Sequence, residues 1–188
     1  MSKNRDRIIQ SALELFSESD FDSVTIKDIC AKARVANSTF YYHFKTKEDL
    51  MDCLRTHDLR PCRGELFALA AMHDLMERTL SACSMCAARA QRSGWALTAQ
   101  YYKHRLNLES ESDELHSLYA QERRTAAELI SHAQEEGLIL NQSSADELAM
   151  AANHLTSSVI VSWCVKKGGF DLMSTVRKNL LVLFNVKH

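Results

Sequence analysis

The scarcity of helix breakers is the feature that most constrains the fold of this chain of 188 residues, which contains one proline and five glycines. Because proline and glycine are the residues that most often interrupt helices, their rarity predicts long helical segments. Hydrophobic residues make up 46% of the chain and charged residues 25%, which is typical of folded globular proteins. We therefore expect an all-α protein.

The first third of the chain has the pattern of four short helices. Apolar residues between Arg5 and Ser19 recur at helical spacing, so the first helix is expected there. Two threonines, each followed three residues later by an aspartate, predict two further helix starts, at Thr25 and at Thr46. Asn37 or Ser38 is expected to cap a short helix between them.

Longer helical patterns follow Pro61. They cover residues 66–92, 95–107, 115–136, 144–167 and 172–184, with the polar residues 109–112 as a loop. The change of pattern predicts a domain junction near residues 58–64. We therefore expect two domains, one over residues 1–57 and a helical one over residues 58–188.

The segment between residues 25 and 44 predicts a helix-turn-helix. Two short helices joined by a tight turn, the second with small polar and aromatic residues, have the pattern of a unit whose second helix enters the major groove of DNA. Phe40 and Phe44 stand four apart and are expected to face inward. The residues expected at DNA are Thr25, Lys27, Asn37, Ser38, Thr39, Tyr41, Tyr42, His43 and Lys47.

"TIKDICAKARVANSTFYYHFKTKEDL", at residues 25–50, resembles the DNA-binding signature of the tetracycline-repressor (TetR-like) family of transcriptional regulators. The resemblance covers about residues 5–54. It implies an all-α homodimer that binds near-palindromic operator DNA and is released by a small-molecule effector. This sequence has Arg34 where the family usually has glycine, and Ala36 where it usually has serine. We therefore expect the turn to be the place where the backbone geometry deviates from that of the family.

The second domain offers candidates for an effector site and for a dimer interface. Aromatic and methionine residues on two neighbouring helical patterns could line an apolar cavity; they are Phe67, Met72, Met76, Trp95, Tyr101, Tyr102 and His104. The last two helices have more apolar residues than one small core needs. The residues expected at the partner chain are Leu155, Val159, Trp163, Val176, Leu180 and Leu183.

The six cysteines leave an alternative open. Cys83 and Cys86 form a C-x-x-C pair, and Cys53, His57 and Cys62 cluster near the junction, so a redox-responsive or metal-responsive regulator is the second reading. The first reading is that the cysteines are buried, reduced and without a bound metal or cofactor. A helical dimerisation protein that no longer binds DNA is a third reading, because the net charge is only −1.

The sequence contains no motif that indicates an enzyme or a membrane protein. No nucleophile elbow, P-loop or G-x-G-x-x-G motif occurs, so we expect no enzyme. The N-terminal segment is polar and the longest apolar runs lie near residues 155–165 and 180–186. These runs are shorter than the roughly 20 residues that span a bilayer. We expect a reduced cytoplasmic protein with no membrane insertion.

Overall fold

The computed structural model describes residues 3–19, 21–59, 68–106 and 113–186, and within these ranges the chain is built of α-helices. The helices before residue 60 are α1 (Lys3–Glu18), α2 (Ile26–Ala33), α3 (Asn37–His43) and α4 (Lys47–Leu59). Those after it are α6 (Leu75–Cys83), α7 (Met85–Leu106), α8 (Asp113–Glu135), α9 (Ala145–Val165) and α10 (Leu172–Phe184). The all-α expectation is confirmed.

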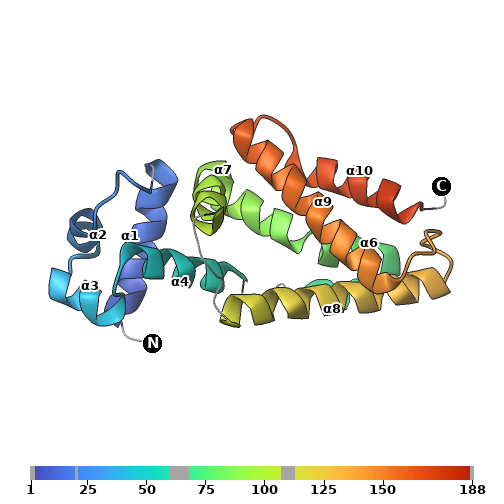
Figure 1. The fold of residues 1–188 in the computed structure, drawn as a ribbon, viewed down its shortest axis with the longest axis horizontal. Helices are drawn as coiled ribbons and strands as arrows, with labels where there is room; N and C mark the ends of the chain where they lie inside the picture. The colour runs from blue at the N-terminus through green and yellow to red at the C-terminus, as the bar shows by residue number, and fades with distance from the viewer. Residues whose placement is uncertain (1–2, 20, 60–67, 107–112, 187–188) are drawn as a thin grey trace.

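The helices form two groups (Figure 1). Helices α1, α2 and α3 lie at one end of the molecule, α6 to α10 form a bundle at the other, and α4 runs from the first group towards the start of α8. Each group has its own apolar core. The first includes Ile8, Phe16, Ile29, Phe40 and Leu50, each fully buried, and the second is centred on α9.

Side-chain capping fixes where several helices begin, as the sequence predicts. At Thr25 and at Ser144 a full capping box forms with the acid three residues on. At Thr46, the Asp49 backbone N–H donates to the threonine hydroxyl (3.0 Å). These bonds satisfy helix N–H groups that otherwise lack partners.

Two expected helices after Pro61 have different boundaries in the structure. The pattern over residues 66–92 is broken at residues 72–74, where Asp74 caps α6, and again at Ser84. α7 then continues through Gly94, whose φ of 79° and ψ of 158° make a kink within the helix. Periodicity alone missed the breaks at residues 72–74 and at Ser84 because apolar residues recur at helical spacing on both sides of each one. The expected boundary between residues 92 and 95 falls at the Gly94 kink. The expected loop at residues 109–112 lies outside the described residues.

The C-terminus is tied back to the loop between α8 and α9. Ile139 and Val186 form an isolated antiparallel bridge. The Asn141 side chain donates to the carbonyl of Leu183 (2.8 Å). This contact closes the bundle at the end remote from α1–α3 (Figure 1).

Candidate DNA-binding surface and effector cavity

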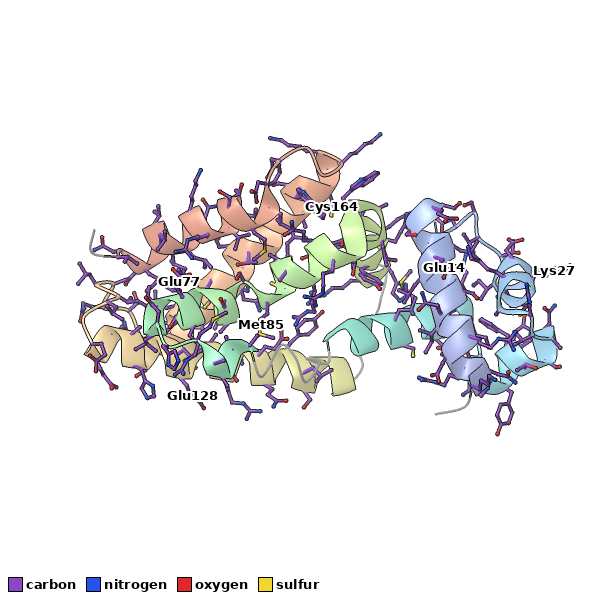
Figure 2. All side chains as sticks on the ribbon, turned by 180° about the vertical axis from the view of Figure 1, so that it is seen from behind. Glu14, Lys27, Glu77, Met85, Glu128 and Cys164 are labelled. Atoms are coloured by element: carbon purple, nitrogen blue, oxygen red, sulfur yellow. The ribbon has the colours of Figure 1, made fainter. Side chains whose placement is uncertain are left out.

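α2 presents its N-terminal turn on the outer surface of the first helix group. Thr25 caps the helix, and its backbone N–H donates to the Asp28 carboxylate (2.8 Å), which also accepts the Thr25 hydroxyl (2.6 Å). These hydrogen bonds lower the pKa of Asp28 below its usual value. Lys27, on the first turn, lies at the end of the molecule opposite Glu77 (Figure 2) and is exposed.

The turn between α2 and α3 is centred on Arg34. Its φ of 53° and ψ of 50° place it in the left-handed region, and its backbone N–H donates to Ala31 (3.1 Å). The N–H of Val35 donates to Cys30 (3.0 Å). Together these bonds end α2 as a left-handed cap does, although glycine is the usual residue there. Arg34 therefore adopts the strained conformation itself.

α3 begins one residue earlier than the capping prediction requires. Ala36 is the N-cap and makes no side-chain cap bond, so the expectation that Asn37 or Ser38 caps the helix is wrong. The reason is local, because Ala36 is already extended and Asn37 is the first helical residue. Both polar side chains are left exposed on the first turn, and that of Thr39 is half-buried.

The aromatic residues of α3 divide between the core and the surface. Phe40 is fully buried and Phe44, just after the helix, is 5% exposed, as expected. Tyr41 is 55% exposed and Tyr42 84% exposed. His43 is half-buried, with its ring 4.9 Å from that of Tyr42. α3 thus presents two tyrosine hydroxyls to solvent while its phenylalanines hold it in place.

Lys47 has a different role from the expected one. Its ammonium group donates to the carbonyls of Phe21 (2.5 Å) and Val24 (2.9 Å), and lies 4.1 Å from the centroid of the Phe21 ring. These contacts fasten the start of α4 to the segment before α2. The expectation that Lys47 serves a DNA phosphate is therefore corrected, because the group is engaged within the protein.

A cavity of about 510 Å³ lies within the second helix group, between α6, α7, α8 and α9. Its size is typical of small-molecule sites. Much of its wall is small and apolar, with Ala82, Ala90, Ala126, Ala149 and Ile160 among the lining residues. Met85, which also lines it, lies inside this group of helices in Figure 2.

The cavity also contains a buried ion pair that the sequence analysis missed. The guanidinium of Arg89, 3% exposed, lies 2.7 and 2.8 Å from the two carboxylate oxygens of Glu122. At the level of the sequence these residues lie 33 positions apart on different helices, and no spacing rule connects them. Arg105 lies over the ring of Tyr119 at 5.3 Å from its centroid, and both line the same cavity.

Only part of the expected effector pocket lines this cavity. Tyr101 and Tyr102 do, and burial raises the pKa of Tyr102 to about 12. The remaining described candidates, Met72, Met76, Trp95 and His104, are not among its lining residues. Phe67 lies outside the described residues. The expectation fails for those four because helical spacing identifies an apolar stripe but not which neighbour covers it.

Trp95 and His104 have other surroundings. Trp95 is 38% exposed and lies beside Gly168, where an added Cβ would be 3.1 Å from the indole. His104 Nε2 lies 3.1 Å from Asp52 Oδ1, on α4, and the His104 ring packs at 6.2 Å from that of Phe21. The next residue back, Lys103, contacts Asp22 at 2.5 Å. The end of α7 therefore joins the cavity to the first helix group.

The expected dimer residues fall into two sets. Val176 and Leu180 are 0% exposed and Trp163 is 7% exposed, because all three pack in the core of the second helix group. These three are corrected to core residues. Leu155, Val159 and Leu183 are half-buried. On the same two helices the exposed apolar residues are Met150, Val161, Val165 and Val182.

The cysteines lie in surroundings that disfavour thiolates. Burial raises the pKa of Cys83 to about 12 and that of Cys86 to about 11, so both are thiols at neutral pH. Cys53 accepts a hydrogen bond from Arg5 (2.9 Å). The side chain of His57, and Cys62, lie outside the described part of the structure, within which no group of three or more potential metal ligands occurs.

α9 is more apolar than the sequence analysis recognised. Among the described helices it alone is long and apolar enough to cross a membrane: it has 21 residues, and an 18-residue stretch within it has a mean hydropathy of 1.3. The expectation that no run approaches that length is corrected. α9 packs against α7, α8 and α10. A helix in the core of a bundle can be as long and as apolar as a membrane-spanning one.

The fold and surface define a class of protein. A capped pair of short helices, fixed over its own core and presenting tyrosines and small polar residues to solvent, is a helix-turn-helix DNA-binding unit. It is joined here to a helical bundle that contains a ligand-sized cavity.

Comparison with known proteins agrees with this class. Residues 8–53 match the family model of bacterial regulatory proteins, tetR family. The "Probable acrEF/envCD operon repressor" of Escherichia coli K12 is 23% identical over 177 residues, which cover 90% of this chain and 80% of that protein. Over residues 8–53 the chain therefore resembles the tetR family of bacterial regulatory proteins.

Solved structures share the fold over the whole chain. A Saccharomonospora viridis protein assigned as a transcriptional regulator, crystallised with choline, has a TM-score of 0.78 at 22% identity and covers 100% of both chains. The regulator FadR from Bacillus subtilis, in complex with stearoyl-CoA, has a TM-score of 0.76 at 16% identity, covering 97% of this chain and 99% of that one.

Proposed function

We propose that this protein is a homodimeric transcriptional repressor that binds a near-palindromic operator and leaves it when a small molecule occupies the cavity. The observation that carries the proposal is the outer surface of α2 and α3, where Tyr41 and Tyr42 are exposed beside Asn37 and Ser38. On this proposal residues 1–57 bind DNA and residues 58–188 bind the effector and the partner chain.

Each residue of this surface has a contact suited to its chemistry. Asn37, Ser38 and Thr39 begin the helix that enters the major groove, where short polar side chains can approach base edges. Tyr41, Tyr42 and His43 donate to phosphates, and Lys27 adds a positive charge beside the flanking backbone. Thr25 positions α2 through its cap. Two copies of α3 set about 34–36 Å apart would reach successive major grooves.

A second copy of the chain is proposed to pack on α9 and α10. Val161, Val165 and Val182 are exposed apolar residues on these helices, and burying them would remove apolar surface from water. The half-buried Leu155, Val159 and Leu183 would extend the same contact.

The effector is proposed to act through α7. This helix lines the cavity with Tyr101 and Tyr102, and through the next two residues, Lys103 and His104, it contacts Asp22 and Asp52. Related structures that hold choline or stearoyl-CoA support a small-molecule site in this fold. A ligand that binds better to a spacing unsuited to DNA lowers operator affinity by that difference in binding free energy. We propose no catalytic activity and a cytoplasmic location.

A gel-shift titration with the DNA upstream of the gene tests the proposal. Lys27→Glu and Tyr42→Ala should each weaken binding at least tenfold, because each removes a contact to the phosphate backbone. Arg124→Glu makes the same charge change on the exposed surface of α8, outside both proposed interfaces, and should bind like the wild type.

Two results would contradict the proposed function. The first is that no upstream fragment is retarded at low salt, where phosphate contacts are strongest. The second is equal weakening by Lys27→Glu and Arg124→Glu, which would mean that net charge, and not the α2–α3 surface, determines binding.

A further inference from the structure

Three sulfur-bearing side chains line the cavity within four consecutive residues. They are Cys83, the last residue of α6, and Met85 and Cys86, the first two residues of α7. Neither cysteine forms a disulfide, and Cys83 is 7% exposed while Cys86 is half-buried. The C-x-x-C pair therefore faces the space in which an effector would lie.

The junction between α6 and α7 holds the two thiols on one side of the chain. Helical hydrogen bonds continue on both sides of Ser84: its N–H donates to the carbonyl of Leu80, and the N–H of Ala88 donates to its carbonyl, both at 3.0 Å. At helical spacing, residues three apart have their β-carbons about 5–6 Å from each other. The Thr156 hydroxyl on α9 donates to the carbonyl of Cys83 (3.4 Å), which fixes the junction to the bundle. The two sulfur atoms are thus within reach of one bridging atom.

The protonation state of the two thiols limits what they can bind. Burial raises the pKa of Cys83 to about 12, with a smaller contribution from the nearby Cys86, and burial raises the pKa of Cys86 to about 11. A metal cation binds thiolates, so two protons would have to leave a buried site before a cation could bind there. A neutral electrophile whose own leaving groups take up these protons avoids that ionisation.

We propose that the cavity binds a neutral trivalent organic arsenical, with two hydroxyl groups on arsenic, through Cys83 and Cys86. Two As–O bonds break and two As–S bonds form. Each thiol proton leaves with one hydroxyl group as water, and arsenic stays trivalent, so the reaction needs no oxidant or reductant. This inference rests on the proposed function for its consequence, because a compound held in the cavity would act there as the effector.

The cavity wall suits the organic group of such a compound. Ala90 and Ile160 are buried lining residues that belong to the same apolar core as Cys83. The thioether of Met85 adds a third soft sulfur atom to the lining. The volume of about 510 Å³ is large enough for an aryl or short alkyl group. The arsenic atom would therefore be held by the thiols while its substituent is removed from water.

Intact-mass spectrometry of the reduced full-length protein with phenylarsine oxide tests the inference. In water this probe hydrates to an arsenical with two hydroxyl groups. One phenylarsenic group should bind per chain and persist in excess mercaptoethanol, a monothiol. Dimercaptopropanol, a dithiol, should remove it, because two linked thiols compete at a high effective concentration. Cu(I) and Zn²⁺ salts should give no adduct that depends on Cys83.

Cys86→Ser and Cys164→Ser form a matched pair of variants. Burial raises the pKa of each thiol to about 11 and both side chains are half-buried, but only Cys86 lines the cavity. Cys86→Ser should abolish the adduct that persists in monothiol, and Cys164→Ser should retain it. Cys83→Ala is the second cavity variant and should also abolish it. Circular dichroism melting checks that each variant is folded.

The outcomes separate this inference from the proposed function. An adduct that needs both Cys83 and Cys86 supports the inference even if gel shifts detect no DNA binding, in which case the repressor proposal alone fails. The absence of an adduct, or an adduct that persists in monothiol in the folded Cys86→Ser variant, would overturn it. So would binding of Cu(I) or Zn²⁺ that needs Cys83. If the protein does bind an operator, phenylarsine oxide should release the wild type and not Cys86→Ser, and retention of the wild type would contradict the effector role.

Discussion

At the scale of single residues, the turn of the DNA-binding unit depends on a residue that does not favour its conformation. Arg34 has a φ of 53° in a position where glycine costs no steric strain. Arg7 donates to its carbonyl (3.2 Å), which helps to hold the turn. The strain is thus retained, and the turn keeps the left-handed geometry.

Replacing Arg34 by glycine should stabilise the protein. Glycine adopts the left-handed conformation without steric strain, so the substitution should raise the free energy of unfolding by about 1 kcal/mol. The greater conformational entropy of glycine in the unfolded chain reduces this gain. Urea unfolding measures this change. Arg34→Ala keeps the strain and removes the charge, so it should give no gain. An equal gain in both variants would assign the effect to charge.

At the scale of elements, α7 is shaped by one glycine. Gly94 has φ 79° and ψ 158°, a region that glycine alone adopts readily. Apart from the adjacent residues and the nearby backbone of α7, no described atom lies within 4 Å of a Cβ added there, so a larger residue would be opposed by the backbone conformation and not by crowding. The kink sets the direction of Trp95–Leu106, which lines the cavity and contacts the first helix group.

Gly94→Ala should therefore destabilise the protein by roughly 1–3 kcal/mol in urea unfolding, or straighten α7. Gly94→Asn should cost as much, because asparagine is tolerated in the left-handed helical region but not at this ψ. If the Gly94→Asn variant were as stable as the wild type, the backbone conformation of Gly94 would not be the cause of the destabilisation by Gly94→Ala.

The pair Glu77–Arg177 connects α6 to α10 through two hydrogen bonds of 2.7 and 2.5 Å. The hydrogen bond from Arg177 lowers the pKa of Glu77 below its usual value. A carboxyl with a lowered pKa stabilises the fold above its unfolded pKa, and the contribution disappears as the pH falls through the folded value.

Glu77→Gln should lower the melting temperature slightly at pH 6 to 7, and the difference from the wild type should vanish in acid, below the usual range of glutamate. The effect is modest because both side chains are about half exposed. Glu128→Gln, on the outer surface of α8 (Figure 2), is the control and should show no such pH dependence. A constant difference at every pH would contradict the assignment.

At the scale of the whole molecule, the two helix groups are connected through the end of α7. The contact between His104 and Asp52 is a partly buried polar link between them, since the imidazole side chain is 7% exposed and the Asp52 side chain 33% exposed. A double-mutant cycle with His104→Gln and Asp52→Asn should give a coupling of about 0.5–1.5 kcal/mol in urea unfolding. Additive effects would mean that this link contributes nothing to joining the groups.

The dimer proposal is tested by the mass in solution. Light scattering should give twice the chain mass of 21.3 kDa. Val182→Glu, at a side chain 81% exposed on α10, should lower the mass towards one chain, because it would bury a charge in the interface. Leu106→Glu, equally exposed at 85% but on α7, should not. An unchanged dimer in Val182→Glu would remove this face from the interface.

Much of the local structure follows from the sequence. Thr25, Thr46 and Ser144 predict their helix starts because a capping box needs only residues three apart in the chain. Phe40 and Phe44 predict their own burial because helical spacing places them on one face. The helix-turn-helix is built from such short-range signals, so the motif and its resemblance to the tetR family could be read from residues 25–50.

Tertiary structure decided what depends on residues far apart in the chain. Lys47 contacts carbonyls 23 and 26 residues earlier, and Arg89 pairs with Glu122 on another helix. Periodicity placed Val176 and Leu180 on an apolar stripe but could not tell a core from an interface, since burying apolar surface is favourable in both. The sequence therefore determined the helices and the DNA-binding motif. Packing between helices determined the cavity and which apolar residues stay exposed.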